Sequence, residues 1–256
     1  ESNMKKNVLA LMLAMLLLLC TQALAEVQTF RAETGTLVAQ GETRMPYYKD
    51  YSDRFGAGKT QDDFIISYVA QTGKDIIVAK DGTITDSDIH GTKAIRECSN
   101  IKISDCTITS EEFGWKSSGI TVTDSSLHAQ YLFFDSRDVV LDKVEMTGKY
   151  SFQYMENLTI RNSVLDTKDA FWHSKNVTVE NSVIKGEYLG WFSEGLTLIG
   201  CKIAGTQPLC YCKNLTLKNC TMEGTDLAFE YSDVQASILG HVDSIKNPRS
   251  GRIVVD

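Results

Sequence analysis

Apolar and polar positions repeat with a period of roughly 19 residues from Asp81 to the neighbourhood of Ser237, without an insertion. Each repeat opens with a turn-forming residue and continues with a run in which apolar and polar residues alternate, as in Asn157-Leu-Thr-Ile-Arg-Asn-Ser. Alternation of this kind predicts a β-strand with one buried face. A fixed period of about 20 residues predicts a solenoid, in which each repeat buries its apolar face by stacking on its neighbours.

The aligned repeats predict three short strands in each turn. The first strand is followed by a corner of Asp or Asn residues, which tolerate the left-handed backbone of a tight bend. A second strand and a glycine-rich bend come next, and a third strand rich in aromatic residues closes the turn. The inward columns of the first strand are Ile101, Ile120, Val139, Leu158, Val177, Leu196, Leu215 and Val234, then Ile103, Val122, Leu141, Ile160, Val179, Leu198 and Leu217.

This pattern predicts an all-β fold, a single-stranded parallel β-helix of about nine rungs over residues 81–239. Helical solenoids need longer repeats of about 33 residues or more, so the spacing excludes them. Residues 26–80 lie outside the period, and we interpret them as an N-terminal cap with a helix at about 60–72, a separate small domain being the alternative. Residues 240–256 are expected to form a C-terminal cap or tail.

Residues 1–25 have the pattern of a secretory signal peptide. Met4 is followed by two lysines, an apolar run over residues 8–19 and a small-residue site that ends at Ala25. The apolar run is shorter than the ~20 residues that a membrane-spanning helix needs. We therefore expect cleavage after Ala25, a secreted or periplasmic protein, and no membrane span. A lipid anchor at Cys20 is disfavoured, because Leu19 stands where lipidated cysteines are preceded by a small residue.

The composition narrows the function classes only slightly. A net charge of −7 without a basic run argues against nucleic acid as a partner. With 43% apolar residues and 3 prolines, the chain is not a disordered one. No motif in the chain predicts a cofactor.

The third strand carries the candidate binding residues. If its side chains alternate in and out, the inward residues are Leu132, Ala170, Leu189 and Leu227 with Phe134, Trp172, Trp191 and Phe229. Its outward face then carries many rings next to carboxylates, an arrangement that suits stacking on sugars. The predicted ligand-binding residues are Tyr131, Phe133, Tyr150, Phe152, Tyr154, Phe171, Tyr188, Phe192 and Tyr211. Two alternatives are that a terminal segment covers this face, or that it binds a protein or a second copy of the chain.

The same outward positions hold acid–base candidates but no convincing catalytic pair. Asp135 and His173 share a column two rungs apart, so about 10 Å separates their backbones, too far for a hydrogen-bonded dyad. Runs typical of polygalacturonases are absent from the repeats. The candidates are Asp135, His173, Asp169, Asp226 and Glu230.

The cysteines of the repeats are best interpreted as small inward residues. Cys106, Cys201 and Cys220 occupy a column that is otherwise held by serine. The strongest disulfide candidate is Cys201–Cys220, on adjacent rungs. Cys210-Tyr-Cys212 lacks the ligand spacing of a zinc site, and no metal site is predicted.

The repeat pattern resembles the right-handed pectate-lyase-like β-helix superfamily, and the resemblance implies right-handed coiling. Four segments are similar to those of an uncharacterised bacterial β-helix family of unknown function, from which no catalytic residue carries over. These segments are Asp169-Ala-Phe-Trp, Gly186-Glu-Tyr-Leu-Gly-Trp, Leu227-Ala-Phe-Glu-Tyr-Ser and Asp243-Ser-Ile-Lys-Asn-Pro.

Two functional hypotheses follow. The first is an exported β-helix protein that binds, and in the stronger form also processes, a polysaccharide or oligosaccharide through the aromatic face. The second is a structural or adhesion protein of the cell envelope without catalytic activity. An open, concave aromatic face favours the first hypothesis, whereas a covered face removes it.

Overall fold

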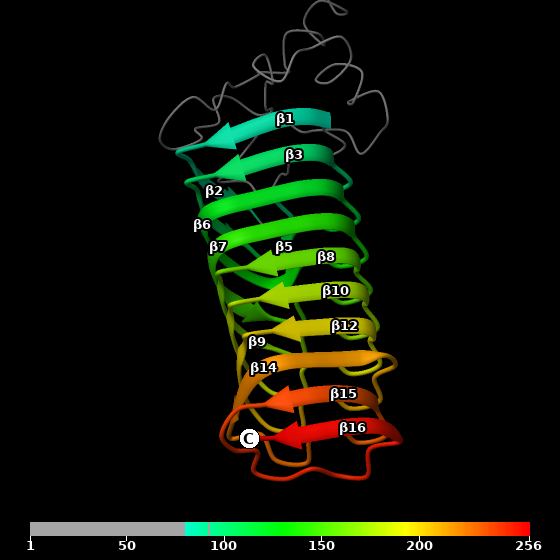
Figure 1. Cartoon of the computed structure of the whole chain (residues 1–256). Coiled ribbons are helices and arrows are strands. Elements are labelled where there is room, and N and C mark those ends of the chain that lie inside the picture. The colour runs from blue at the N-terminus through cyan, green and yellow to red at the C-terminus, as the bar shows by residue number, and fades with distance from the viewer. Residues whose placement is uncertain (1–79, 92) are drawn as a thin grey trace, which may run out of the picture.

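A computed structural model describes residues 80–91 and 93–256 (Figure 1). They form an all-β parallel solenoid of about nine turns with a spacing of about 19 residues, which confirms the predicted fold class. The described residues contain strands and turns but no helix. The predicted signal peptide and the predicted N-terminal cap with its helix lie outside the described residues.

The first side of the solenoid is a ladder of parallel strands that run across the front of Figure 1. Its register equals the sequence period, since Val177 pairs with Leu158 on one side and Leu196 on the other. Both predicted inward columns are buried along this side. Its strands are β1 (Lys80–Thr85), β3 (Ser99–Ser104), the first parts of β6 (Ser118–Leu132) and β7 (Arg137–Lys149), β8 (Glu156–Arg161), β10 (Lys175–Glu180), β12 (Glu194–Ile199), the first part of β14 (Leu215–Glu223), β15 (Asp233–Ile238) and β16 (Ser250–Val255).

The second side is a shorter parallel ladder that begins after the Asp/Asn corner. One apolar side chain per turn enters the core from it, for example Ile184, which pairs with Leu165 and Ile203. Its strands are β2 (Asp88–Gly91), β4 (Thr107–Ser110), β9 (Val164–Lys168), β11 (Val183–Lys185) and β13 (Lys202–Ala204), together with the later parts of β6, β7 and β14. One more short strand, β5 (Glu112–Phe113), pairs with the end of β6.

The corners hold Asn and Asp because the backbone there is left-handed and their side chains bond from rung to rung. Asn157 has a φ of 59°, and its Nδ2 donates to Asp138 Oδ1 at 2.9 Å. Asn176 Nδ2 in turn donates to Asn157 Oδ1 at 3.3 Å. Gly195 continues this column with a φ of 71°, where a side chain would be strained.

Two inward columns of serine and cysteine satisfy backbone groups that face the core. Ser117 Oγ accepts from Cys98 N at 3.1 Å and donates to the Trp115 carbonyl at 3.2 Å. Cys201 and Cys220 are both buried free thiols, as expected for structural cysteines rather than a disulfide. Burial raises the pKa of Cys212 to about 12, so this thiol stays neutral.

The C-terminal segment builds an incomplete further rung. Residues 244–247 pair with the last turn of the third side, where Ala228 N donates to Ser244 O and Lys246 N to Ala228 O, both at 3.0 Å. Strand β16 then pairs with β15 and extends the first side. The segment predicted as a cap therefore continues two of the three ladders.

The period is interrupted in this last turn, so the expectation of a repeat without insertions is wrong there. Tyr211 N donates to Glu230 O, which aligns Tyr211 with Tyr231, whereas Leu215 pairs with Val234. The spacing from Tyr211 to Tyr231 is one residue longer than the spacing from Leu215 to Val234. This extra residue moves Ala228 into the core and gives the outward position to Tyr231.

Candidate functional site

The third side of the solenoid is a parallel ladder, but its backbone does not have β-strand geometry. Tyr150, Phe152 and Tyr154 all have positive φ angles, of 50°, 61° and 56°, and alternate with residues of ordinary φ. Their N–H groups still bond to neighbouring rungs: Tyr150 N to Lys168 O at 2.8 Å, Phe152 N to Leu132 O at 2.7 Å. The following rungs repeat this alternation, which places every second residue in the left-handed region.

This backbone turns side chains inward and outward in pairs rather than alternately. Leu132 and Phe133 both point into the core, and the next two residues, Phe134 and Asp135, point outward. The predicted outward placement of Phe133, Phe152 and Phe171 is therefore wrong, since all three are fully buried. The predicted inward placement of Phe134, Trp172 and Trp191 is also wrong, since these rings lie half-buried on the outside.

The buried phenylalanines form a column inside the core. The ring centroids of Phe133 and Phe152 lie 6.4 Å apart and those of Phe152 and Phe171 lie 5.2 Å apart, with the ring planes nearly parallel. Phe113 meets the top of the column edge-on at 5.4 Å. These rings hold the rungs together and are inaccessible to a ligand.

The half-buried tryptophan rings form hydrogen bonds with backbone carbonyls of the next rung. The indole Nε1 groups of Trp115, Trp172 and Trp191 donate to backbone carbonyls of the following turn, at 3.1, 2.6 and 2.8 Å. Gln153 occupies the same column and its Nε2 donates to the Asp169 carbonyl at 3.1 Å. The column therefore has a structural role.

The outermost column is a continuous stack of five rings, Tyr154, His173, Phe192, Tyr211 and Tyr231, which we call the ring stack. Successive centroids lie 5.0, 5.0, 4.9 and 6.0 Å apart, and the interplanar angles are 7–17°. Because the faces of the inner rings cover one another, only their edges meet solvent. Tyr154 begins the stack and is 50% exposed, with the much shorter Asp135 aligned with it on the preceding rung.

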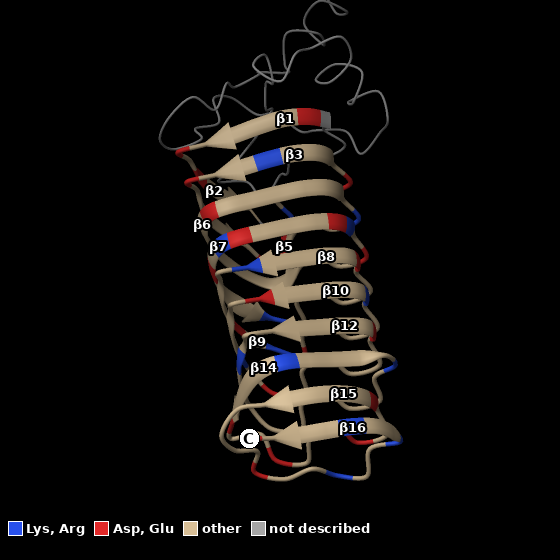
Figure 2. Cartoon of the chain, in the orientation of Figure 1, with Lys and Arg blue, Asp and Glu red and all other residues tan. Residues whose placement is uncertain are grey.

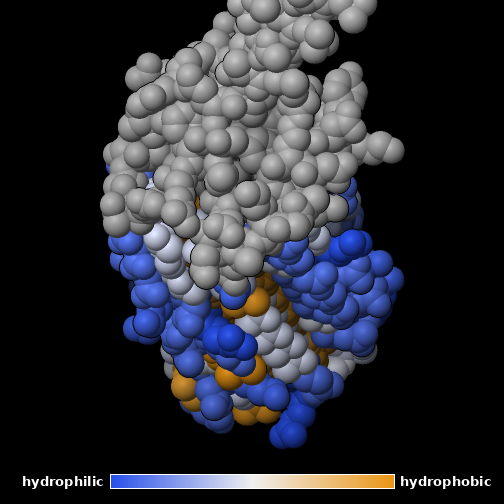
Figure 3. All heavy atoms as spheres, turned by 90° about the horizontal axis from the view of Figure 1, so that it is seen from above, coloured by the Kyte–Doolittle hydropathy of each residue, from blue (hydrophilic) through white to orange (hydrophobic). Residues whose placement is uncertain are grey.

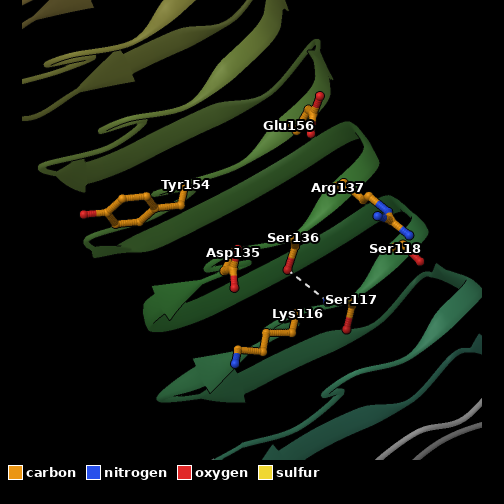
Figure 4. Close-up of a pocket in the computed structure, with 8 residues that line it drawn as sticks. All are labelled: Lys116, Ser117, Ser118, Asp135, Ser136, Arg137, Tyr154 and Glu156. Carbon is orange, nitrogen blue, oxygen red and sulfur yellow. Dashed lines mark hydrogen bonds between the residues drawn. The ribbon is translucent and has the colours of Figure 1, made fainter.

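A polar hollow of about 310 Å³ opens at this end of the ring stack (Figure 4). Its two banks are columns of outward side chains from three successive rungs, and its floor is formed by two buried serines. One bank consists of Lys116, Asp135 and Tyr154, the other of Ser118, Arg137 and Glu156, and the floor of Ser117 and Ser136.

The polar groups of the floor already form hydrogen bonds within the fold, whereas the banks present polar side chains without such partners. Ser117 N donates to Ser136 Oγ at 3.1 Å, and Ser136 Oγ donates to the Gly114 carbonyl at 2.8 Å. Within the described residues, the side chains of Lys116, Asp135 and Glu156 form no hydrogen bond or ion pair. A ligand in the hollow would therefore meet donors and acceptors that the fold itself does not use.

A family model described as "Protein of unknown function (DUF3737)" matches residues 60–256. The chain belongs to the DUF3737 family. No curated protein and no solved structure matches it. The hollow, the ring stack and the buried phenylalanine column all fall within the matched residues of this DUF3737 chain.

Of the predicted binding residues, only Tyr154 lines the hollow. Phe192 and Tyr211 lie further along the ring stack. Tyr131, Tyr150 and Tyr188 lie half-buried on the opposite flank of the third side, where Tyr131 stacks on Tyr150 at 5.1 Å. Lys168 Nζ sits 5.2 Å from the centre of the Tyr188 ring. The DUF3737 structure therefore divides the predicted aromatic face into a buried column, an outer flank and the ring stack.

The predicted acid–base residues are not brought together. Asp169 is buried on the opposite flank, and burial raises the pKa of its carboxyl, with Lys168 acting in the other direction. Glu230 pairs with Lys246 at 3.1 Å and accepts from the Tyr211 hydroxyl at 3.3 Å, so it ties the C-terminal segment to the rod. His173 lies inside the ring stack, and Asp135 alone reaches the hollow.

Lys116, Arg137 and Glu156 were not predicted as site residues, although a signal for two of them exists. Arg137 and Glu156 belong to a column in which charge alternates with each rung, continuing through Lys175, Glu194 and Lys213. Opposite charges on paired neighbours are favourable. Figure 2 shows both signs interspersed along the corners of the DUF3737 rod.

Figure 3 looks along the rod, and the described residues visible in this view are mostly hydrophilic with small apolar areas between them. Within residues 80–91 and 93–256, no group of three His, Cys, Asp or Glu side chains is placed to hold a metal ion. The same residues include no helix with the length and apolar character needed to cross a membrane.

Proposed function

We propose that this DUF3737 protein is an exported protein that binds carbohydrate in the hollow, with one sugar ring stacked on the face of Tyr154. The observation that carries the proposal is the environment of Tyr154, the first ring of the ring stack. Each inner ring is sandwiched between two parallel neighbours, but on the side of the preceding rung no ring lies parallel to Tyr154, whose contact there is the T-shaped one with Phe134 at 5.4 Å. A sugar ring takes the next place in the stack, which buries apolar area on one face of the sugar.

The banks of the hollow match sugar hydroxyls, each of which both donates and accepts. Lys116 and Arg137 provide donors, and Asp135 and Glu156 provide acceptors. Two cationic and two anionic groups balance, which favours a neutral sugar over a charged one. The hollow is at the small end of the range for ligand sites, about 300–1,000 Å³, so it suits one end or one unit of an oligosaccharide.

The proposal is for binding and assigns no reaction. The hollow holds two carboxyls, Asp135 and Glu156, on opposite banks, and the proposal uses both as hydrogen-bond acceptors rather than as the carboxyl pair that glycoside hydrolysis needs. The resemblance to the pectate-lyase-like superfamily supports a carbohydrate ligand by analogy. The predicted signal peptide supports a location where polysaccharide is accessible.

The test is a screen of the full chain against a glycan library, followed by titration calorimetry with the best ligand. Loss of one stacked ring is expected to weaken binding about tenfold, equivalent to about 1.4 kcal/mol. Tyr154→Ala should show this loss. Tyr231→Ala, at the other end of the ring stack and outside the hollow, is the matched control and should bind like the parent. A parent that binds no glycan ends the proposal.

A second candidate function is a structural or adhesion role at the cell envelope. It is favoured by Phe192, a ring 45% exposed in the middle of the ring stack and outside the hollow. Because its faces are covered by His173 and Tyr211, it presents an apolar edge, which suits contact with a protein surface. Phe192→Ala should leave glycan binding unchanged, and loss of adhesion in cells that carry this variant would support the second candidate instead.

A further inference from the structure

Within the described residues, the rung that contains β16 leaves both its backbone edge and its core open. Strand β16 pairs with β15 and, among the described residues, with no other strand. Ile238 is fully buried, whereas Val255, which pairs with it on β16, is 45% exposed, and Ile245 on the third side of the same rung is 40% exposed. An open edge beside exposed apolar residues is a surface on which another strand can pair.

Strand β16 lacks the features that protect free edges. It contains no proline, no lysine and no bulge, and Arg252 is its only charged residue, followed by Asp256. Natural edge strands are usually blocked by such features, because an unprotected edge recruits other strands. This edge is therefore suited to pairing.

The hydrogen bonds to β15 determine which groups face outward at the edge. Asp256 N donates to Ile238 O at 2.9 Å, and Ile238 pairs with Val255. In a parallel ladder this pattern turns the N–H and C=O groups of residues 252, 254 and 256 toward β15. Residues 251, 253 and 255 therefore direct their backbone groups to the free edge.

We propose that two copies of this chain pair end to end through their β16 edges, antiparallel and about a twofold axis at Val254. In this register Ile253 of one copy lies opposite Val255 of the other, and the two exchange backbone hydrogen bonds. Both side chains are on the inward face, so the two cores become continuous. On the outward face Arg252 lies opposite Asp256 of the second copy, which gives two ion pairs across the axis.

The charges select this register over its neighbour. Opposed residues in an antiparallel ladder must both face the edge or both face away, so the axis must lie on a residue. An axis at Ile253 places Arg252 opposite Val254 and leaves its charge without a partner. A twofold contact also closes the assembly, whereas stacking of β16 on β1 of the next copy gives an open filament.

The test is sedimentation velocity of the full chain over a concentration series, with charge-swapped variants. The parent is expected to dimerise. Arg252→Glu and Asp256→Arg should each weaken the dimer at least tenfold by bringing like charges together, and the double swap should restore it. Lys202→Glu, an exposed change on the second side, should leave the dimer intact.

Three results would overturn the proposal. They are a parent that stays monomeric at all concentrations, a dimer unaffected by both single swaps, and a series of larger oligomers that grows with concentration, which indicates stacking on β1. A dimer that Phe192→Ala abolishes and the swaps leave intact belongs to the ring stack instead. Circular dichroism melting of each variant separates loss of pairing from loss of fold.

Discussion

The first and third sides of the rod share a register but differ in backbone. On the first side, residues alternate strictly inward and outward, as Thr197 and Leu198 do. On the third side, every second residue is left-handed and side chains turn in and out in pairs. Both sides form parallel ladders with the same repeat. The comparison shows that a sequence period determines which residues stack, whereas the backbone of each side determines where those stacks point.

The two sides also differ in the free-energy cost of their backbone conformation and in the interactions that offset it. A β-branched ladder on the first side adopts its preferred backbone. On the third side, residues such as Phe152, Tyr154 and His173 adopt left-handed angles that cost about 1–2 kcal/mol each. Rung-to-rung hydrogen bonds and stacked rings offset that cost. The aromatic content of the third side is thus partly structural.

The largest expected effect on stability comes from a charge placed in the core of the first side. Leu198→Asp places a charge in the middle of a fully buried column, with no partner, and should abolish cooperative unfolding. Thr197→Asp on the outward face should be tolerated. Thermal unfolding followed by circular dichroism checks both variants, and equal tolerance would show that the columns of the first side are wrongly assigned.

The next largest effect is a difference in stability loss between the buried phenylalanine column and the ring stack of the third side. Phe152→Ala removes a fully buried ring and should lower the free energy of unfolding by about 3–5 kcal/mol. Tyr154→Ala removes an exposed ring that stacks on His173 and makes a T-shaped contact with Phe134, and should cost about 1 kcal/mol. Guanidinium denaturation measures both. Similar losses for the two variants would mean that Tyr154 is covered.

A smaller effect tests the half-buried column. Trp172→Phe keeps a ring but removes the Nε1 donor that lies 2.6 Å from the Tyr188 carbonyl, and should cost about 1–3 kcal/mol. Gln153→Leu removes the corresponding bond to the Asp169 carbonyl and should cost a similar amount. If neither variant changes the denaturation midpoint, these side-chain hydrogen bonds to the carbonyls do not contribute to stability.

The smallest effect concerns pH at the end of the first side. Hydrogen bonds from Arg249 and then Ser250 lower the pKa of Asp233 to about 2. Since the folded pKa lies below the usual value of 3.8, this group stabilises the fold above about pH 4, and the contribution is lost as the pH falls to about 2. Subtracting the pH profile of Asp233→Asn from that of the parent should show a difference confined to this window. A flat difference would mean that the pairing is not formed in solution.

The period alone was enough to predict the solenoid, its turns, the inward columns of the first side and the inward serine and cysteine column, because β-strands alternate reliably. It did not predict the third side, because rings such as Phe152 disfavour the left-handed backbone and give no local sign of it. The displacement of Tyr231 by one residue depends on a hydrogen bond from Tyr211 that no spacing reveals. Tyr154 and Asp135 were predicted as site residues, but the hollow depends on how three rungs align their side chains.

The central claim is that the third side uses its buried rings for folding and the free face of Tyr154 for binding. The most direct measurement is calorimetric titration of the best glycan from the library into the parent and into Tyr154→Ala, with the unfolding transition of each protein recorded in parallel. We predict that the parent binds, and that the variant binds about tenfold more weakly with an unfolding midpoint close to that of the parent. Equal affinity of the two proteins, or no glycan bound by the parent, would contradict the claim.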